Sequence, residues 1–124
     1  MTDDNISTMA RAIAQQEGFG VPGARPTRNH NCGDLRGWPG YPVDEGGFSI
    51  FPDDETGWAK LREDIGNHAN RWPGQSLGAF VGGDGTINGW TGYAPASDSN
   101  DPVAYAAALA KALGCEVSTT FCEL

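Results

Sequence analysis

Glu17 is the carboxylate with the strongest indication of chemistry in this sequence. Apolar residues precede it at three- and four-residue spacing: Ile6, Met9, Ala10, Ile13 and Ala14. This spacing predicts a helix with one apolar face, which Glu17 continues just before Gly18 and Gly20 end the helix. Burial disfavours the charged form, so a sheltered Glu17 would have a raised pKa and could act as a general acid. A frayed last turn would instead leave Glu17 in water.

The composition indicates one domain of short elements joined by many turns. The 124 residues include 18 glycines and 8 prolines, and 39% are hydrophobic. A net charge of −8, without a basic stripe, argues against nucleic-acid binding. No apolar run of about 18 residues predicts a membrane span, and the acidic start MTDDNISTM does not resemble a signal peptide. We therefore expect a single domain over residues 1–124, with 1–5 flexible, made in the cytoplasm and monomeric.

Apolar spacing and capping residues predict a mostly helical α+β chain. The expected helices cover residues 5–17, 54–70, 77–81 and 102–113, with a further helical turn possible at 86–90. Glycines and prolines predict a loop over residues 21–27. Two short apolar runs, at 35–38 and 48–51, predict a small antiparallel β-hairpin with a long loop.

The helix over 54–70 has a clear buried face, formed by Trp58, Leu61, Ile65 and Ala69. His68 is expected on its solvated surface. The last helix is apolar around much of its circumference, including Val103 and Ala107, and is expected to be central and closely packed.

The cysteines and histidines predict neither a metal site nor a cofactor. Cys115 and Cys122 are close enough in sequence for a disulfide that would leave Cys32 free, and three free thiols remain equally open. His30 is poorly placed to activate Cys32 as a nucleophile. The histidines and cysteines also lack the spacing of a zinc site.

Four stretches resemble, in the same order, segments of lysozyme-like domains that cleave peptidoglycan in phage endolysins, virion proteins and lytic transglycosylases. RNHNCGDLR, residues 28–36, is similar to the R-N-N-N-P-G-N/D-L/I-R segment of that superfamily. AIAQQEGF precedes it, and FSIFPDDETGWA and YAPASDSNDPVAY follow it. Together they cover about residues 10–114. Cys32 replaces the proline of the pattern and loosens the turn, because cysteine does not fix φ.

The resemblance implies a lysozyme-like fold with a cleft between the helix end and the hairpin. It also implies cleavage of the β-1,4 linkage between N-acetylmuramic acid and N-acetylglucosamine. Glu17 maps onto the acid that protonates the leaving oxygen. A second carboxylate would come from Asp34, Asp44 or Glu45; Asp34 lies in the matched segment, where the superfamily also accepts Asn.

Two reaction outcomes stay open at this point. With a second carboxylate facing Glu17, the enzyme is a muramidase, a glycosidase that hydrolyses the linkage. Without one, the N-acetyl group of the sugar stabilises the transition state, and the muramic 6-hydroxyl attacks to form an anhydro product. That second outcome is the reaction of a lytic transglycosylase.

Peptidoglycan glycan strands are the expected partner, bound by amide, guanidinium and aromatic side chains. The candidate contacts are Asn29, Asn31, Arg36, Trp38, Tyr41 and Tyr93. Asn31 could instead stabilise its own turn, and Trp38 and Tyr93 could pack in the core. The resemblance places such a protein in cell-wall degradation during phage lysis or virion entry. The alternative is a non-catalytic phage structural or wall-binding module with the same fold.

Overall fold

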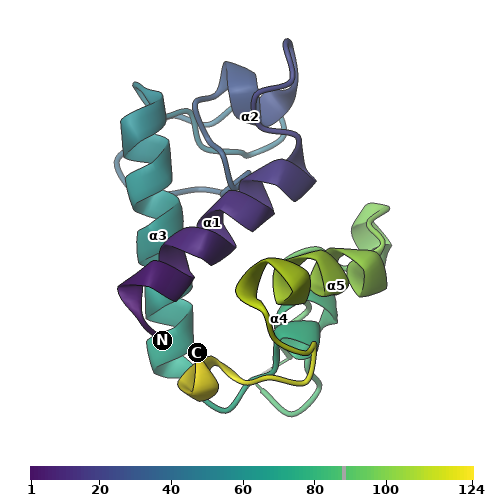
Figure 1. Ribbon diagram of the computed structural model, residues 1–124. Coiled ribbons are helices and arrows are strands. Elements are labelled where there is room, and N and C mark those ends of the chain that lie inside the picture. The colour runs from purple at the N-terminus through teal and green to yellow at the C-terminus, as the bar shows by residue number, and fades with distance from the viewer. Residues whose placement is uncertain (88) are drawn as a thin grey trace. The chain divides into compact units, whose positions relative to one another are not determined.

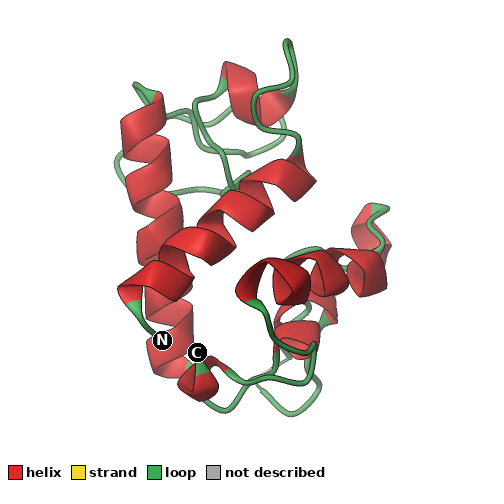
Figure 2. Ribbon diagram, viewed as in Figure 1, coloured by secondary structure: helices red, strands yellow, loops and turns green. Residues whose placement is uncertain are grey.

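The computed structural model describes residues 1–87 and 89–124 and is mostly helical (Figures 1 and 2). Its α-helices are α1 (Asp3–Glu17), α2 (Arg25–Arg28), α3 (Asp54–Arg71), α4 (Leu77–Gly82) and α5 (Pro102–Leu113). Short 3-10 helices cover Ala96–Asp98 and Phe121–Glu123. The chain divides into two compact units, which we call the mid-chain unit (Ala10–Ile65) and the terminal unit (Met1–Met9 with Gly66–Leu124).

Helix α1 ends at Glu17, as the sequence predicts. Met9, Ala10, Ile13 and Ala14 are buried along it. Gly18 and Gly20 follow with φ of 85° and 94°, a left-handed backbone that glycine adopts without strain. The start differs from the expectation, because α1 already begins at Asp3. The Asn5 side-chain amide donates to the Leu124 carbonyl at 2.7 Å, and residues 3–5, part of the segment expected to be flexible, form the first turn of α1.

Helix α2 was not expected, since residues 21–27 were predicted as a loop. It is a single turn, Arg25–Arg28, with Pro26 in its first two positions. The fixed φ of proline suits the first turn of a helix, where its missing N–H removes no hydrogen bond. The N-cap residue, Ala24, has no capping side chain. A capping side chain, the usual sequence signal for the start of a helix, is therefore absent here.

Helix α3 carries the predicted apolar face. Leu61, Ile65 and Ala69 are buried, while Trp58 is half-buried and meets the Phe19 ring edge-on at a centroid distance of 5.5 Å. A side chain at Gly57 would overlap the carbonyl oxygen of His30. Only glycine allows α3 to approach the preceding loop this closely.

The predicted β-hairpin is absent as a regular element. Arg36 pairs with Phe48 and Val43 pairs with Ser49, each as an isolated antiparallel bridge, and the described residues form no longer strand. The two apolar segments therefore face each other as predicted. Prolines and positive-φ glycines between them prevent a continuous ladder, because proline lacks an N–H donor.

Helices α4 and α5 pack side by side in the terminal unit (Figure 1). The predicted caps are confirmed: Ser76 accepts from the Ala79 amide at 3.2 Å, and Asp101 accepts from the Ala104 amide at 3.1 Å. Gly114 ends α5 with φ of 69°. The expectation that α5 is enclosed is wrong, because Val103 is 79% exposed and only one face is buried.

The expectation that His68 is a surface residue is also wrong. Its ring packs at centroid distances of 4.9 Å from Phe80, 4.6 Å from Trp90 and 5.6 Å from Phe121. We call these four residues the aromatic cluster. His68 follows Ile65 by three residues, so it lies on the buried face of α3. Its Nε2 also hydrogen-bonds the side-chain oxygen of the buried Gln75.

Two other expectations concern the terminal unit. The disulfide considered for Cys115 and Cys122 is not formed, since both are free thiols. The helical turn considered for residues 86–90 includes residue 88, which lies outside the described residues; Asp84 and Trp90 pair as an isolated bridge. Within the described part of the chain, no helix has the length and apolar character needed to cross a bilayer.

Candidate active site

Glu17 and Asp34 form a hydrogen-bonded carboxyl pair in the mid-chain unit. Glu17 is the last residue of α1 and is half-buried, as is Asp34. An ionised carboxylate has only acceptor atoms, so two carboxyl groups can hydrogen-bond only while one of them carries a proton. The contact therefore requires a proton on one of the two groups at the end of α1.

Several influences of opposite sign act on the pKa of Asp34. Burial is the largest influence and raises the pKa of Asp34, which the nearby charge of Asp44 raises further. The guanidinium groups of Arg25 and Arg36 oppose this rise. The hydrogen bond from Glu17 also opposes it, but the net direction stays upward.

One oxygen of the Asp34 carboxyl group has no hydrogen-bond partner in the described part of the chain. Asp34 Oδ1 is buried and accepts no hydrogen bond from the described residues. Buried acceptors are nearly always satisfied in folded proteins, so an unsatisfied one needs an explanation. A carboxyl group that exchanges a proton with a bound molecule would provide it.

The backbone at Asp34 is strained as well. Its φ is 50°, in the left-handed region, and His30 nearby has φ of 51°. Aspartate tolerates this conformation better than most residues, since its short side chain can bond locally. Strained residues of this kind concentrate at functional sites.

Asn31 holds the loop that carries Asp34. Its side-chain amide donates to the carbonyls of Leu35 and Ser49, both at 2.9 Å, and its oxygen accepts from the Leu35 amide at 2.9 Å. Asn31 is fully buried. The Asn31 side chain therefore stabilises its own turn, which is the alternative to a sugar contact that the sequence left open.

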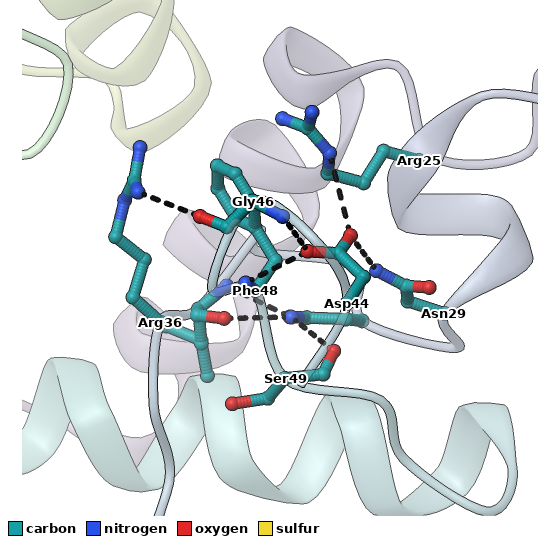
Figure 3. A network of polar contacts seen from close by, with 9 residues as sticks. Arg25, Asn29, Arg36, Asp44, Gly46, Phe48 and Ser49 are labelled. Atoms are coloured by element: carbon teal, nitrogen blue, oxygen red, sulfur yellow. Dashed lines mark hydrogen bonds and ion pairs between the residues drawn. The ribbon is translucent and has the colours of Figure 1, made fainter. Parts of the chain in front are cut away.

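Asp44 ties a second part of the same loop together (Figure 3). Its Oδ1 accepts from the amides of Gly46 and Phe48, at 2.9 and 3.0 Å. Its Oδ2 accepts from the buried Asn29 side chain at 2.9 Å and lies 3.5 Å from Arg25 Nε. The hydrogen bond from Asn29 is the main cause that lowers the pKa of Asp44. Asp44 is therefore an ionised structural group.

We call Asn29, Asn31, Asp44 and Ser49, with the backbone groups they bind, the loop network. Ser49 is fully buried, and its hydroxyl accepts from the Trp38 amide at 2.8 Å. Four polar side chains thus position the loop where regular strands are missing. Glu45, the third carboxylate considered as a partner for Glu17, is exposed beside this network.

The predicted aromatic contacts fall in different places. Trp38 is half-buried, and Lys60 Nζ lies 5.3 Å from its ring centroid. Tyr41 meets the Phe51 ring edge-on at 5.0 Å. Both belong to the mid-chain unit, whereas Tyr93 lies in the terminal unit and stacks on Phe80 at 5.3 Å.

The remaining titratable groups of the mid-chain unit do not form a nucleophilic or metal centre. Cys32 is buried, and burial raises the pKa of its thiol to about 12, so it is protonated near neutral pH. His30 Nδ1 pairs with Asp54 Oδ1 at 2.7 Å on the exposed surface. Across residues 1–87 and 89–124, no group of three or more His, Cys, Asp or Glu side chains could hold a metal ion.

Two residues of this site were missed by sequence reasoning. Arg25, placed in a loop, pairs with Asp44 and contributes to the electrostatics of Asp34. Phe48 was predicted only as a strand residue. The guanidinium groups of Arg25 and Arg36 both contact its ring. No local pattern signals these contacts, because the partners are 10 or more residues apart.

The chain matches no family model, and neither curated proteins nor solved structures provide a match.

Proposed function

We propose that this protein cleaves the β-1,4 linkage between N-acetylmuramic acid and N-acetylglucosamine in peptidoglycan. The observation that carries the proposal is the hydrogen-bonded pair of Glu17 and Asp34, which holds a proton beside an unsatisfied buried acceptor. Glycoside cleavage needs a proton donor for the leaving oxygen and a base for the attacking hydroxyl. The resemblance of residues 28–36 to the lysozyme-like segment gives the substrate class.

In this proposal Glu17 gives its proton to the leaving glycosidic oxygen as the C1–O bond breaks. The ionised pair then takes a proton from the hydroxyl group that attacks C1, which restores the starting state. Asp34 positions Glu17 through their hydrogen bond. Burial raises the pKa of Asp34, which favours a proton on the pair.

The contact between the two carboxyl groups bears on the type of reaction. Inverting glycosidases separate their carboxyl groups by about 6.5–9.5 Å to hold a water molecule between them. Retaining enzymes keep theirs about 5–5.5 Å apart, with the second carboxylate free to attack C1. A hydrogen-bonded pair fits neither arrangement, so the contact between Glu17 and Asp34 favours a single acid/base and the anhydro-forming attack of the muramic 6-hydroxyl.

Replacement of Glu17 by glutamine tests the proposal. E17Q keeps the size and hydrogen-bonding capacity of the side chain but cannot donate a proton, so lysis of purified peptidoglycan should fall by on the order of a hundredfold or more. Circular dichroism should show an unchanged fold. Glu55→Gln, at an exposed position of α3, is the matched control and should keep wild-type activity.

Product masses decide the remaining alternatives. Products heavier by one water molecule indicate a muramidase, and anhydro products indicate a transglycosylase. An active E17Q would contradict the mechanism. Wild-type protein that binds peptidoglycan without cleaving it would instead favour the non-catalytic wall-binding module.

A further inference from the structure

The Phe48 ring supports two guanidinium groups. The Cζ atoms of Arg25 and Arg36 each lie 4.1 Å from the ring centroid, and Figure 3 shows them on either side of Phe48. Such cation–π contacts hold an arginine side chain in place and reduce the entropy that it would lose on binding a ligand. The two arginines nevertheless differ in what else they contact.

Arg25 is already paired with a carboxylate. Its Nε lies 3.5 Å from Asp44 Oδ2, and the Asp44 side chain is only 9% exposed. The charge of Arg25 is therefore largely compensated within the loop network. A ligand anion at Arg25 would also meet the negative charge of Asp44.

In the described structure, Arg36 is not held in an ion pair of this kind. It is exposed, donates to the Gly46 carbonyl at 3.3 Å, and forms no ion pair among the described residues. The chain contains sixteen acidic residues against eight basic ones, so carboxylates are abundant. A guanidinium group has five N–H donors in a planar fork. Arg36 thus presents an oriented and largely unused set of donors.

The position of Arg36 links it to the carboxyl pair. Its charge is one of those that act on Asp34, which places the guanidinium within electrostatic range of the proposed catalytic group. Asp34 accepts the hydrogen bond from Glu17. An anion held by Arg36 would therefore bind in the same unit as the carboxyl pair.

We infer that Arg36, held on the Phe48 ring, binds a carboxylate of the substrate and so selects carboxylate-bearing amino sugars over neutral ones. The inference rests on the proposed function, in which muramic acid units alternate with neutral N-acetylglucosamine. A planar carboxylate matches the guanidinium fork with two parallel hydrogen bonds. In a strand that carries peptides, the lactyl carboxyl group is consumed in an amide bond and the carboxylate belongs to the peptide. In a strand without peptides it belongs to the lactyl group.

Binding of small sugars tests the inference without any cleavage. The probes are N-acetylglucosamine, N-acetylmuramic acid and N-acetylmuramoyl-L-alanine, titrated at low ionic strength and followed by amide chemical shifts in NMR spectra. The wild-type protein should bind the acidic sugars about tenfold more tightly than the neutral one. Tighter binding of N-acetylmuramic acid identifies the lactyl carboxylate, and tighter binding of N-acetylmuramoyl-L-alanine identifies the peptide carboxylate.

Three variants locate the effect. Arg36→Gln should reduce the preference to near parity, and Arg36→Lys should keep only part of it, because a lysine ammonium cannot form the bidentate contact. Arg28→Gln, which removes the same charge from another exposed position, should keep the full preference. The Arg36 side chain is exposed, so these changes should leave the fold intact.

Equal wild-type affinity for the acidic and neutral sugars would overturn the inference, as would an unchanged preference in Arg36→Gln. These outcomes are separate from the test of cleavage. If wild-type protein and E17Q are equally inactive on peptidoglycan, the proposed function fails while the binding preference can still be measured. If cleavage depends on Glu17 but no preference exists, only the role of Arg36 is lost.

Discussion

The two units hold their shape by different means. The mid-chain unit relies on the loop network, in which amide, hydroxyl and carboxylate side chains bind backbone groups and one another at 2.8–3.0 Å. The terminal unit relies on the aromatic cluster, whose rings pack around Phe80 on α4. Hydrogen bonds are directional and ring packing is much less so. The mid-chain unit, which contains the candidate site, is the one stabilised by directional bonds.

Backbone strain follows the same division. Two of the three non-glycine residues with positive φ in the described chain, His30 and Asp34, lie in the mid-chain loop. The loop network holds this unfavourable conformation through several buried hydrogen bonds at once. The comparison teaches that directional polar contacts stabilise the candidate site, and four variants would test it.

The largest effect should come from the aromatic cluster. Phe80 is 1% exposed and contacts His68, Trp90 and Phe121. Phe80→Ala would leave a cavity and should lower the free energy of unfolding by about 3–5 kcal/mol. Urea denaturation measures this change. Val103→Ala, at an exposed position, should be nearly neutral, and equal stabilities of the two variants would contradict the central role of Phe80.

Loss of the loop network should have a somewhat smaller effect. Asn31→Ala removes three hydrogen bonds and leaves buried groups of Leu35 and Ser49 without partners. We expect a loss of about 2–3 kcal/mol of unfolding free energy, because unsatisfied buried polar groups carry a desolvation cost. The exposed Asn67→Ala is the control. A stability like that of the control would show that the network contributes little.

The smallest expected effect is on the pH dependence of stability, to which Asp34 and Asp84 should contribute with opposite signs. Burial raises the pKa of Asp34, so its contribution to stability is greatest below the unfolded pKa of about 3.9 and is lost as the pH rises through the native pKa. Asp34→Asn cannot ionise and keeps the tolerance for positive φ. Its stability relative to wild type should therefore increase as the pH is raised.

Asp84 in the terminal unit provides the contrast. Hydrogen bonds from Thr86, helped by Gln75, lower the pKa of Asp84, so the carboxylate stabilises the fold at pH values above its unfolded pKa. Asp84→Asn should consequently lose stability relative to wild type as the pH rises. Urea denaturation across a pH series measures both variants, and slopes of the same sign would contradict the assignment.

Helix ends were the features most readily predicted from the sequence. Asp101, Pro102 and Gly114 bound α5 as expected, and Gly18 stops α1 directly after Glu17. Each signal acts within a few residues, because a cap satisfies the free groups of the nearest turn. His68 could have been placed correctly too, since its spacing from Ile65 puts it on the buried face of α3.

The sequence by itself therefore determined the segments that form α1, α3, α4 and α5, where these helices end and which carboxylate closes the apolar face of α1. Only the tertiary structure decided that Asp34 meets Glu17 and that Asp44 belongs to the loop network. It also decided that Arg36 rests on Phe48 without an acidic partner among the described residues. Helices depend on local hydrogen bonds, whereas these contacts join residues separated by ten or more positions, which one-dimensional spacing does not encode.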